Sequence, residues 1–284
     1  MRLLILYIII LCQCFFNFQE TSFAEDWQEL KSEHFIVYFM QDDKFAHDLL
    51  YKAEVYYKQI ASDIGYARYS GFWTWDKRVK IYIYPDHASF LKATGQPEWS
   101  QGMADYKNKK IISFTWSSNF LSSLLPHEMT HLIFRDFVGF KGEVPLWLDE
   151  GVAQWEEEEK RIRIKAIASQ LLKNTMFLSI QDLTKLDIRR MQADEIVYIR
   201  SIPQREGPDD VLFLSGDKLV HTYYIQSASL VGFLIEKYGS GNFADFCRQL
   251  RDGKTLEEAL RFAYPTHITN LKDLEKEWYK YLLE

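Results

Sequence analysis

Apolar and polar residues follow two different spacings along the chain. Three short apolar runs, rich in β-branched and aromatic residues, predict strands at 34–40, 79–84 and 110–116. Between the first two runs, apolar residues recur at helical spacing over 45–64, and Gly65 is a natural stop. A shorter helix is expected over 88–94. This part of the chain therefore predicts a small mixed sheet with helices packed on it.

From residue 119 onward, helical spacing prevails. We expect helices over 127–137, 145–173 with a break inside it, 221–238, 242–251, 255–263 and 270–284. A polar stretch at 201–218 holds prolines and glycines and predicts a surface loop. The pattern as a whole indicates an α+β fold, with an α/β lobe over about 25–118 and a mainly helical lobe over 119–284.

The first 24 residues (1–24) have the features of a secretory signal peptide. A basic start at Arg2 precedes an apolar run over 3–16, and small residues at Ser22 and Ala24 fit a cleavage site. We therefore predict cleavage after Ala24 and a periplasmic or extracellular location. The apolar run is shorter than the roughly 20 residues of a spanning helix. An uncleaved membrane anchor is thus the second interpretation, and the one that would hold the chain at a membrane.

Charge and cysteine content narrow the possible partners. The formal net charge of −6 argues against nucleic acid or an anionic membrane as the main partner. The acidic run at 156–159 is expected to be a solvated helix face, balanced in part by the basic residues within 160–163. Cys12 and Cys14 leave with the signal segment, so the mature chain has no disulfide partner for Cys247. We expect Cys247 to be a small buried hydrophobe.

Residues 127–131 read His-Glu-Met-Thr-His within an apolar helical stretch. Positions four apart lie on one helix face, so His127 and His131 can place two imidazole nitrogens on one zinc ion at about 2.0–2.1 Å. Glu128 is then close enough to reach a water on the zinc without binding the metal itself. Two unpaired histidines buried in such a helix would be costly, which favours a metal site over solvated histidines.

A third ligand is available in the next predicted helix. Eighteen residues separate His131 from Glu150, and Gly142 and Pro145 supply a turn that lets the second helix pack back on the first. Two histidines and one glutamate leave the fourth position of the zinc open, as a catalytic site requires. Asp149 is the competing candidate, but it points away if Glu150 points in, so we expect it to contact a ligand rather than the metal.

These motifs together resemble those of a known enzyme family. HEMTH, eighteen residues and then WLDEGVA resemble the gluzincins, most of all the peptidase MA-like family, with zinc-dependent alanyl-type aminopeptidases as better-known relatives. The resemblance covers roughly residues 26–284, although those aminopeptidases usually carry WLNEGFA. It implies a zincin-like fold, with the active-site helix and a cleft between the two lobes. It also implies one Zn²⁺ per chain, held by His127, His131 and Glu150, with Glu128 as general base.

The resemblance extends to one further catalytic residue. Tyr-Ile-Gln-Ser begins at Tyr224 and leads into an apolar helix, which is similar to the family segment whose tyrosine stabilises the transition state. This implies that Tyr224 donates to the developing oxyanion. Tyr223 is the neighbouring alternative, and His221, one turn earlier, is another.

One departure from the family pattern concerns the substrate terminus. The aminopeptidase relatives carry a Gly-x-Met-Glu-Asn segment whose glutamate binds the free amine of the substrate. This chain has Gly-Met-Ala-Asp over 102–105, and the glutamate is missing. Asp105 is the nearest substitute. The resemblance therefore implies a peptidase without implying an aminopeptidase.

The sequence thus predicts that residues 25–284 form an exported zinc metallopeptidase that acts on a peptide or protein, with no nucleic-acid partner. We expect the substrate to lie extended along the strand at 110–116. The alternative is a zinc-binding module that holds a peptide or cell-envelope ligand without cleaving it. The presence of Glu128 favours the enzyme, because a binding module has no need of that carboxylate.

Overall fold

A computed structural model describes residues 27–66, 71–98, 100–115, 120–191, 196–201 and 210–284. The predicted signal segment, its cleavage site after Ala24, and Cys12 and Cys14 lie outside these described residues. Among the described residues, no helix combines the length and the apolar character needed to cross a membrane.

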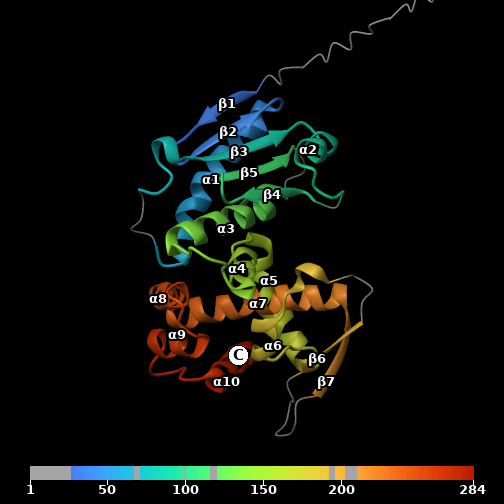
Figure 1. The fold of residues 1–284 in the computed structure, drawn as a ribbon, viewed down its shortest axis with the longest axis vertical. Coiled ribbons are helices and arrows are strands. Elements are labelled where there is room, and N and C mark those ends of the chain that lie inside the picture. The colour runs from blue at the N-terminus through green and yellow to red at the C-terminus, as the bar shows by residue number, and fades with distance from the viewer. Residues whose placement is uncertain (1–26, 67–70, 99, 116–119, 192–195, 202–209) are drawn as a thin grey trace, which may run out of the picture.

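A five-stranded mixed sheet forms the N-terminal part of the fold, in the order β1-β2-β3-β5-β4 (Figure 1). The strands are β1 (Gln28–Lys31), β2 (Phe35–Phe39), β3 (Val79–Tyr84), β4 (Gly102–Asp105) and β5 (Lys110–Phe114). The three predicted strands are β2, β3 and β5, and they pair in parallel. The short strands β1 and β4 were not predicted, and each pairs antiparallel at one edge of the sheet.

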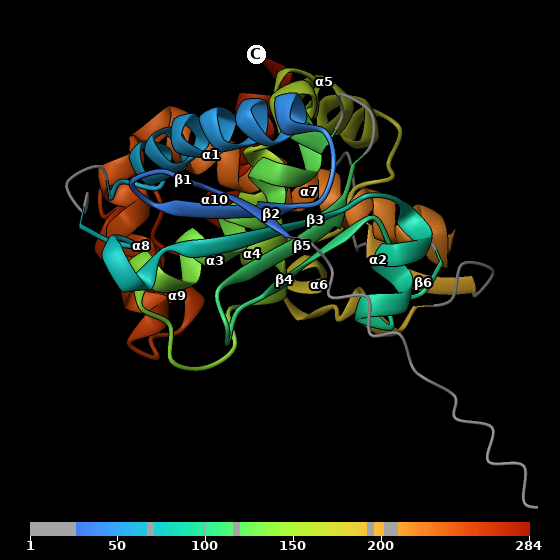
Figure 2. The ribbon, with the colours of Figure 1, turned by 90° about the horizontal axis from the view of Figure 1, so that it is seen from above.

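Helices cover one face of this sheet (Figure 2). The N-terminal helices are α1 (Asp43–Asp63), α2 (His87–Thr94) and α3 (Leu125–Val138), with a short 3-10 turn at Trp75–Lys77. Asp42 begins α1 by accepting a hydrogen bond from the backbone N–H of Phe45 at 2.9 Å. α1 contacts both β2 and α3, and α3 reaches the edge strand β4. The predicted helices at 45–64, 88–94 and 127–137 are therefore present with small shifts of their ends.

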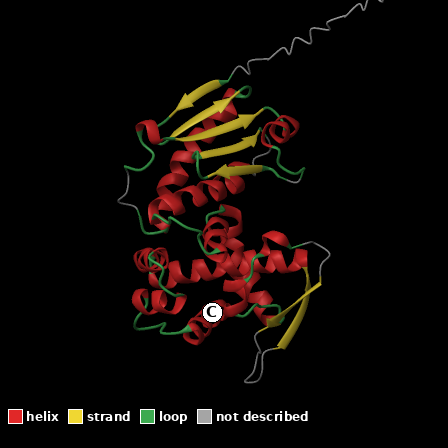
Figure 3. Cartoon of the chain, viewed as in Figure 1, coloured by secondary structure: helices red, strands yellow, loops and turns green. Residues whose placement is uncertain are grey.

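The C-terminal part is mainly helical, as predicted (Figure 3). Its helices are α4 (Leu146–Trp155), α5 (Glu158–Lys173), α6 (Ile180–Lys185), α7 (Gly216–Tyr238), α8 (Ser240–Arg251), α9 (Leu256–Ala263) and α10 (Leu271–Leu283), with a 3-10 turn at Ile188–Arg190. The expected break within 145–173 falls between α4 and α5. α7 lies at the centre and packs closely on α4.

The stretch 201–218, predicted as a loop, contains regular structure. β6 (Ile196–Ser201) and β7 (Asp210–Ser215) pair antiparallel, and α7 begins at Gly216. The loop prediction weighed the prolines and glycines of the stretch above the apolar residues 211–214, which favour a strand. Residues 202–209 lie outside the described part of the chain.

Buried apolar side chains form one contiguous cluster that joins the sheet to the helices. It runs from Phe35 in β2 through Phe134 in α3 and Leu148 in α4 to Trp278 in α10. Cys247 belongs to it as a buried free cysteine, and burial raises the pKa of its thiol. α3 and α4, which carry the candidate metal ligands, therefore sit inside the core that connects the two ends of the molecule.

Candidate metal centre

The two histidines of the motif lie on α3, one helical turn apart. A π-helical turn at Phe120–Leu124 leads into the helix, and Pro126 occupies its first turn. The helix ends at Gly139, whose φ of 81° is a left-handed conformation that glycine adopts without a steric cost. The Nε2 atoms of His127 and His131 face each other at 3.2 Å.

Glu150 completes a group of three ligand atoms. It is the fifth residue of α4, and its Oε2 lies 3.8 Å from Nε2 of His127. Ligand atoms of His127, His131 and Glu150 all lie within 4.8 Å of one another. Tetrahedral zinc with bonds of about 2.0–2.1 Å requires its ligand atoms to be roughly 3.3 Å apart. The two measured separations bracket this value, so the three residues fit a zinc ion.

Close packing of α4 on α7 fixes the position of Glu150. The next residue, Gly151, lies so near α7 that a Cβ atom there would be 2.7 Å from the backbone oxygen of Ser227. Only a residue without a side chain allows this approach. The Glu-Gly pair in the sequence therefore combines a ligand with the helix contact that positions it.

A buried carboxylate supports His131 from the other side of its ring. Nδ1–H of His131 donates to Oδ1 of Asp149 at 2.9 Å, and Arg135 donates to Oδ2 of Asp149 at 3.0 Å. This assigns the proton to Nδ1 and turns the lone pair of Nε2 towards the metal position. Asp149 thus contacts a ligand, in the position expected for it from the sequence.

The electrostatic field at the site favours positive charge. Burial alone would lower the pKa of the metal-free His131, but the carboxylates of Asp149, Glu150 and Glu128 raise it to about 9. Burial acts to raise the pKa of Asp149, yet His131 and Arg135 hold it below its usual range. The carboxylates of Asp149, Glu150 and Glu128 around His131 give the pocket a negative charge that suits a cation.

His127 has a carboxylate partner of its own. Its Nδ1–H donates to Oε1 of Glu157 at 3.1 Å, and the same oxygen accepts from Nζ of Lys160 at 2.8 Å. The hydroxyl of Ser123 donates to the second oxygen of Glu157. Burial acts to raise the pKa of Glu157, but the hydrogen bond and charge of His127, together with Lys160, hold it below its usual range. Both histidines are therefore oriented by an ionised carboxylate.

The prediction of a solvated face at 156–159 was wrong for its first two residues. Glu156 and Glu157 are buried, whereas Glu159 is exposed. α4 ends at Trp155 and α5 begins at Glu158, so the two buried residues form the corner between the helices. The side chains of Glu156 and Glu157 point inward at this corner, whereas the prediction assumed a continuous helix with these residues on its solvent face.

Glu128 is half-buried and lines the same cavity as His127. No hydrogen bond joins its carboxylate to another residue in the described part of the chain. Glu128 is thus adjacent to the candidate metal position with its oxygens available.

The three candidate oxyanion donors lie on α7 in different environments. Tyr223 is fully buried, and its hydroxyl has no hydrogen-bond partner among the described residues. Tyr224 is half-buried; burial and the charge of Glu150 raise its pKa to about 12. Burial, with Glu150 again contributing, also raises the pKa of Tyr223. His221 is exposed. The charge of Glu150 therefore contributes to the raised pKa of both tyrosines, whereas His221 faces solvent.

Besides Glu157, two further residues at the site were not predicted from the sequence. The guanidinium of Arg135 lies 4.4 Å above the ring of Tyr106, and that ring meets the His131 ring edge-on at a centroid distance of 6.1 Å. Arg135 lies four residues after His131, so helical spacing was a signal that could have found it. Tyr106 follows β4 and is brought to the site by the tertiary fold, which no local pattern in the sequence indicates.

The edge strand beside the site is β4. Residues 110–116 were expected to hold the substrate, but β5 over Lys110–Phe114 lies between β3 and β4 and has no open edge. Its apolar composition suits this interior place. Asp105, at the end of β4, accepts from the backbone N–H of Asn108 at 3.1 Å and from its side-chain amide at 2.7 Å. Its carboxylate closes the β4–β5 turn.

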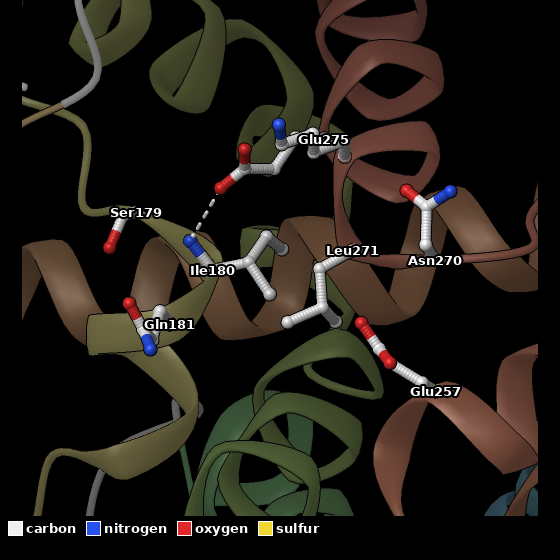
Figure 4. A pocket seen from close by; sticks show the side chains of 8 residues that line it. Ser179, Ile180, Gln181, Glu257, Asn270, Leu271 and Glu275 are labelled. Atoms are coloured by element: carbon white, nitrogen blue, oxygen red, sulfur yellow. Dashed lines mark hydrogen bonds between the residues drawn. The ribbon is translucent and has the colours of Figure 1, made fainter. Parts of the chain in front are cut away.

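Two cavities are prominent in the described structure. One, of about 470 Å³, is lined by His127 and Glu128 and lies at the metal centre. The other, of about 510 Å³, lies between α6, α9 and α10 (Figure 4). In it, Glu275 accepts a hydrogen bond from the backbone N–H of Ile180 at 2.9 Å. None of the candidate metal ligands lines this second cavity.

Comparisons with known proteins place few limits on function. No protein-family model matches the chain, and no curated protein matches it. Among solved structures, it is similar to native yeast LTA4 hydrolase, with a TM-score of 0.44 and 14% sequence identity over 91% of this chain and 39% of that chain. The chain thus spans less than half the length of that hydrolase.

Proposed function

We propose that the chain is a zinc-dependent metallopeptidase with a zincin-like fold. One observation carries the proposal: nitrogens of His127 and His131 and an oxygen of Glu150 converge within 4.8 Å, with Glu128 beside them on an open cavity. Two imidazoles and a carboxylate are the ligands of a catalytic rather than a structural zinc site. The carboxylates behind both imidazoles support the same assignment, because metal-binding histidines commonly have such partners.

Different residues of the chain have separate roles in amide hydrolysis. A bound zinc would supply a Lewis acid that lowers the pKa of a water towards about 7 and polarises the scissile carbonyl. Glu128 accepts the proton of the attacking water and delivers it to the leaving amine. Tyr224 donates its hydroxyl to the developing oxyanion, a contribution of about 3 kcal/mol for one well-placed donor. Tyr223 is the alternative donor.

The substrate would be an extended peptide paired with β4. This strand has one edge hydrogen-bonded to β5, and no strand in the described part of the chain pairs with its other edge. It also contacts α3, which carries the catalytic motif. We propose that an extended peptide added to this edge lies beside α3 and so reaches Glu128. We further propose that the protein is exported by its first 24 residues.

A combined metal and cleavage measurement tests this proposal. Purified protein is loaded with zinc, its metal content is measured by mass spectrometry, and it is incubated with a peptide mixture that is read for internal and terminal cuts. Glu128→Gln should keep zinc and lose about 100-fold or more in turnover, because the ligands are intact and the base is gone. His131→Ala should lose most of the zinc.

Two results would count against the enzyme. Turnover by a metal-loaded Glu128→Gln variant equal to that of the wild type would reject Glu128 as the base. A wild-type protein that holds one zinc and cleaves no peptide in the mixture would instead support a zinc-binding module that holds its ligand uncleaved.

A further inference from the structure

The cavity at the metal centre has two sides, one formed by catalytic residues and the other by mainly polar side chains, which we call the polar wall. His127 and Glu128 form the side nearest the candidate ligands. The remaining lining residues are Gln101, Ser123, Leu124, Gln154, Glu157 and Lys160. With a volume of about 470 Å³, the cavity has room for an amino-acid side chain. A substrate group bound in it would lie next to the bond on which Glu128 acts.

The one carboxylate in this polar wall is already occupied. Oε1 of Glu157 accepts from Nδ1 of His127 at 3.1 Å and from Nζ of Lys160 at 2.8 Å, and Ser123 donates to its other oxygen. The Glu157 side chain is only 3% exposed. Three of its roughly four acceptor positions are thus used by protein groups, so it has little to offer a cationic substrate.

The donors of the wall remain available. Lys160 uses two of its three N–H groups, one on Glu157 and one on Oε1 of Gln154 at 2.8 Å. Because the oxygen of Gln154 accepts from Lys160, its NH₂ group is left to donate. No hydrogen bond within the described structure uses that NH₂ group or the third N–H of Lys160. The half-exposed ammonium and the amide therefore present donors to the cavity.

We propose that this cavity is a specificity subsite for a carboxylate next to the scissile bond, bound by Lys160 and Gln154. This inference rests on the proposed peptidase function. A carboxylate is favoured over an amide because hydrogen bonds between two charged groups are stronger than neutral ones. The carboxylate has two possible sources, the side chain of an acidic residue or the C-terminus of a short peptide.

Matched peptides distinguish these sources. Each contains one scissile bond flanked on either side by Glu, Gln or Lys, and each is made with a free or an amidated C-terminus. kcat/KM of the zinc-loaded full chain should be at least about tenfold higher for Glu than for Gln at one flanking position. If the C-terminus is the bound group, the advantage instead follows the free terminus and disappears on amidation.

Two variants link the preference to the wall. Gln154→Glu replaces a donor with an acceptor that pairs with Lys160. The preference for the Glu peptide over the Gln peptide should therefore disappear, and kcat/KM for the Lys peptide should rise. Lys160→Met should also remove the preference; it touches Glu157, so its zinc content is measured alongside. Arg163→Met is the matched control, because it removes a charge from an exposed position on the same helix. It should keep the preference of the wild type.

The possible outcomes distinguish failure of the carboxylate subsite from failure of the peptidase function. Cleavage of Glu, Gln and Lys peptides at equal kcat/KM, with either terminus, overturns the subsite while leaving the peptidase intact. If no peptide is cleaved, the peptidase fails and the Kd values of the same peptides decide the subsite. Tighter binding of the carboxylate-bearing peptide, lost in Gln154→Glu, supports it, and equal binding rejects it.

Discussion

Glu156 is a buried carboxyl whose protonation should control stability. Its side chain is fully buried at the corner between α4 and α5, and neither oxygen has a hydrogen-bond partner among the described residues. Among the described residues, Arg161 is the cation that lies within ion-pair distance, with Nη1 at 3.9 Å from Oε2. That guanidinium is engaged by Asp63 at the end of α1. One arginine thus faces two acids, which leaves Glu156 without a close counter-charge.

This environment changes the proton affinity of the group. Burial and the negative charge of Asp63 raise the pKa of Glu156 from 4.5 to about 8, against the opposing effect of Arg161. An acid whose folded pKa is raised stabilises the fold through its bound proton. The stabilisation is complete below the unfolded pKa and is lost as the pH rises through the folded pKa. Linkage between pKa values of 4.5 and about 8 gives a loss of about 2 kcal/mol between pH 6 and pH 8.

Glu156→Gln should remove this pH dependence. Glutamine has the shape of the protonated acid and cannot ionise. The free energy of unfolding of the variant should therefore rise by about 2 kcal/mol relative to that of the wild type on going from pH 6 to pH 8. Urea unfolding at the two pH values, followed by tryptophan fluorescence, measures the difference. The exposed Glu159→Gln is the control and should track the wild type. A stability difference between Glu156→Gln and wild type that is the same at both pH values would refute the reasoning.

Three further changes probe the metal centre. Asp149→Ala should weaken zinc binding about 10- to 100-fold, measured by competition with a chelator, because the carboxylate that orients His131 is lost; unchanged affinity would contradict this. Tyr224→Phe should lower kcat about 100-fold or more with zinc retained, and a larger loss in Tyr223→Phe would transfer the role to Tyr223. Gly151→Ala should lower the free energy of unfolding in urea by about 1–3 kcal/mol, because the added Cβ would lie 2.7 Å from a backbone oxygen of α7. Gly142→Ala is the control and should leave it unchanged, because no atom lies within 4 Å of a Cβ there.

Local rules in the sequence were sufficient for the elements that carry the site. The pair at His127 and His131 follows from helical spacing, and the structure brings Glu150 to the same point, as the turn before α4 suggested. The parallel strands and most helices followed from their apolar spacing. Fold class at the level of an N-terminal mixed sheet and a helical C-terminal part is confirmed.

What escaped prediction depends on contacts between distant segments. Whether Glu157 faces solvent or His127 depends on how α5 departs from α4, and an acidic run looks the same in either case. β4 is four residues long with little apolar character, so only its pairing with β5 identifies it. Tyr106 lies in the turn between β4 and β5, and it reaches His131 because β4 packs on α3.

The corner between α4 and α5 places two consecutive carboxyl groups in opposite roles. Glu156 is buried with no hydrogen-bond partner among the described residues, whereas Glu157 accepts a hydrogen bond from the imidazole of the candidate metal ligand His127. One peptide unit joins them, so we expect a movement that brings water to Glu156 to shift Glu157 as well. Alkaline conditions should therefore loosen the fold and misalign His127 together, which makes this short bend a mechanical link between global stability and the metal centre.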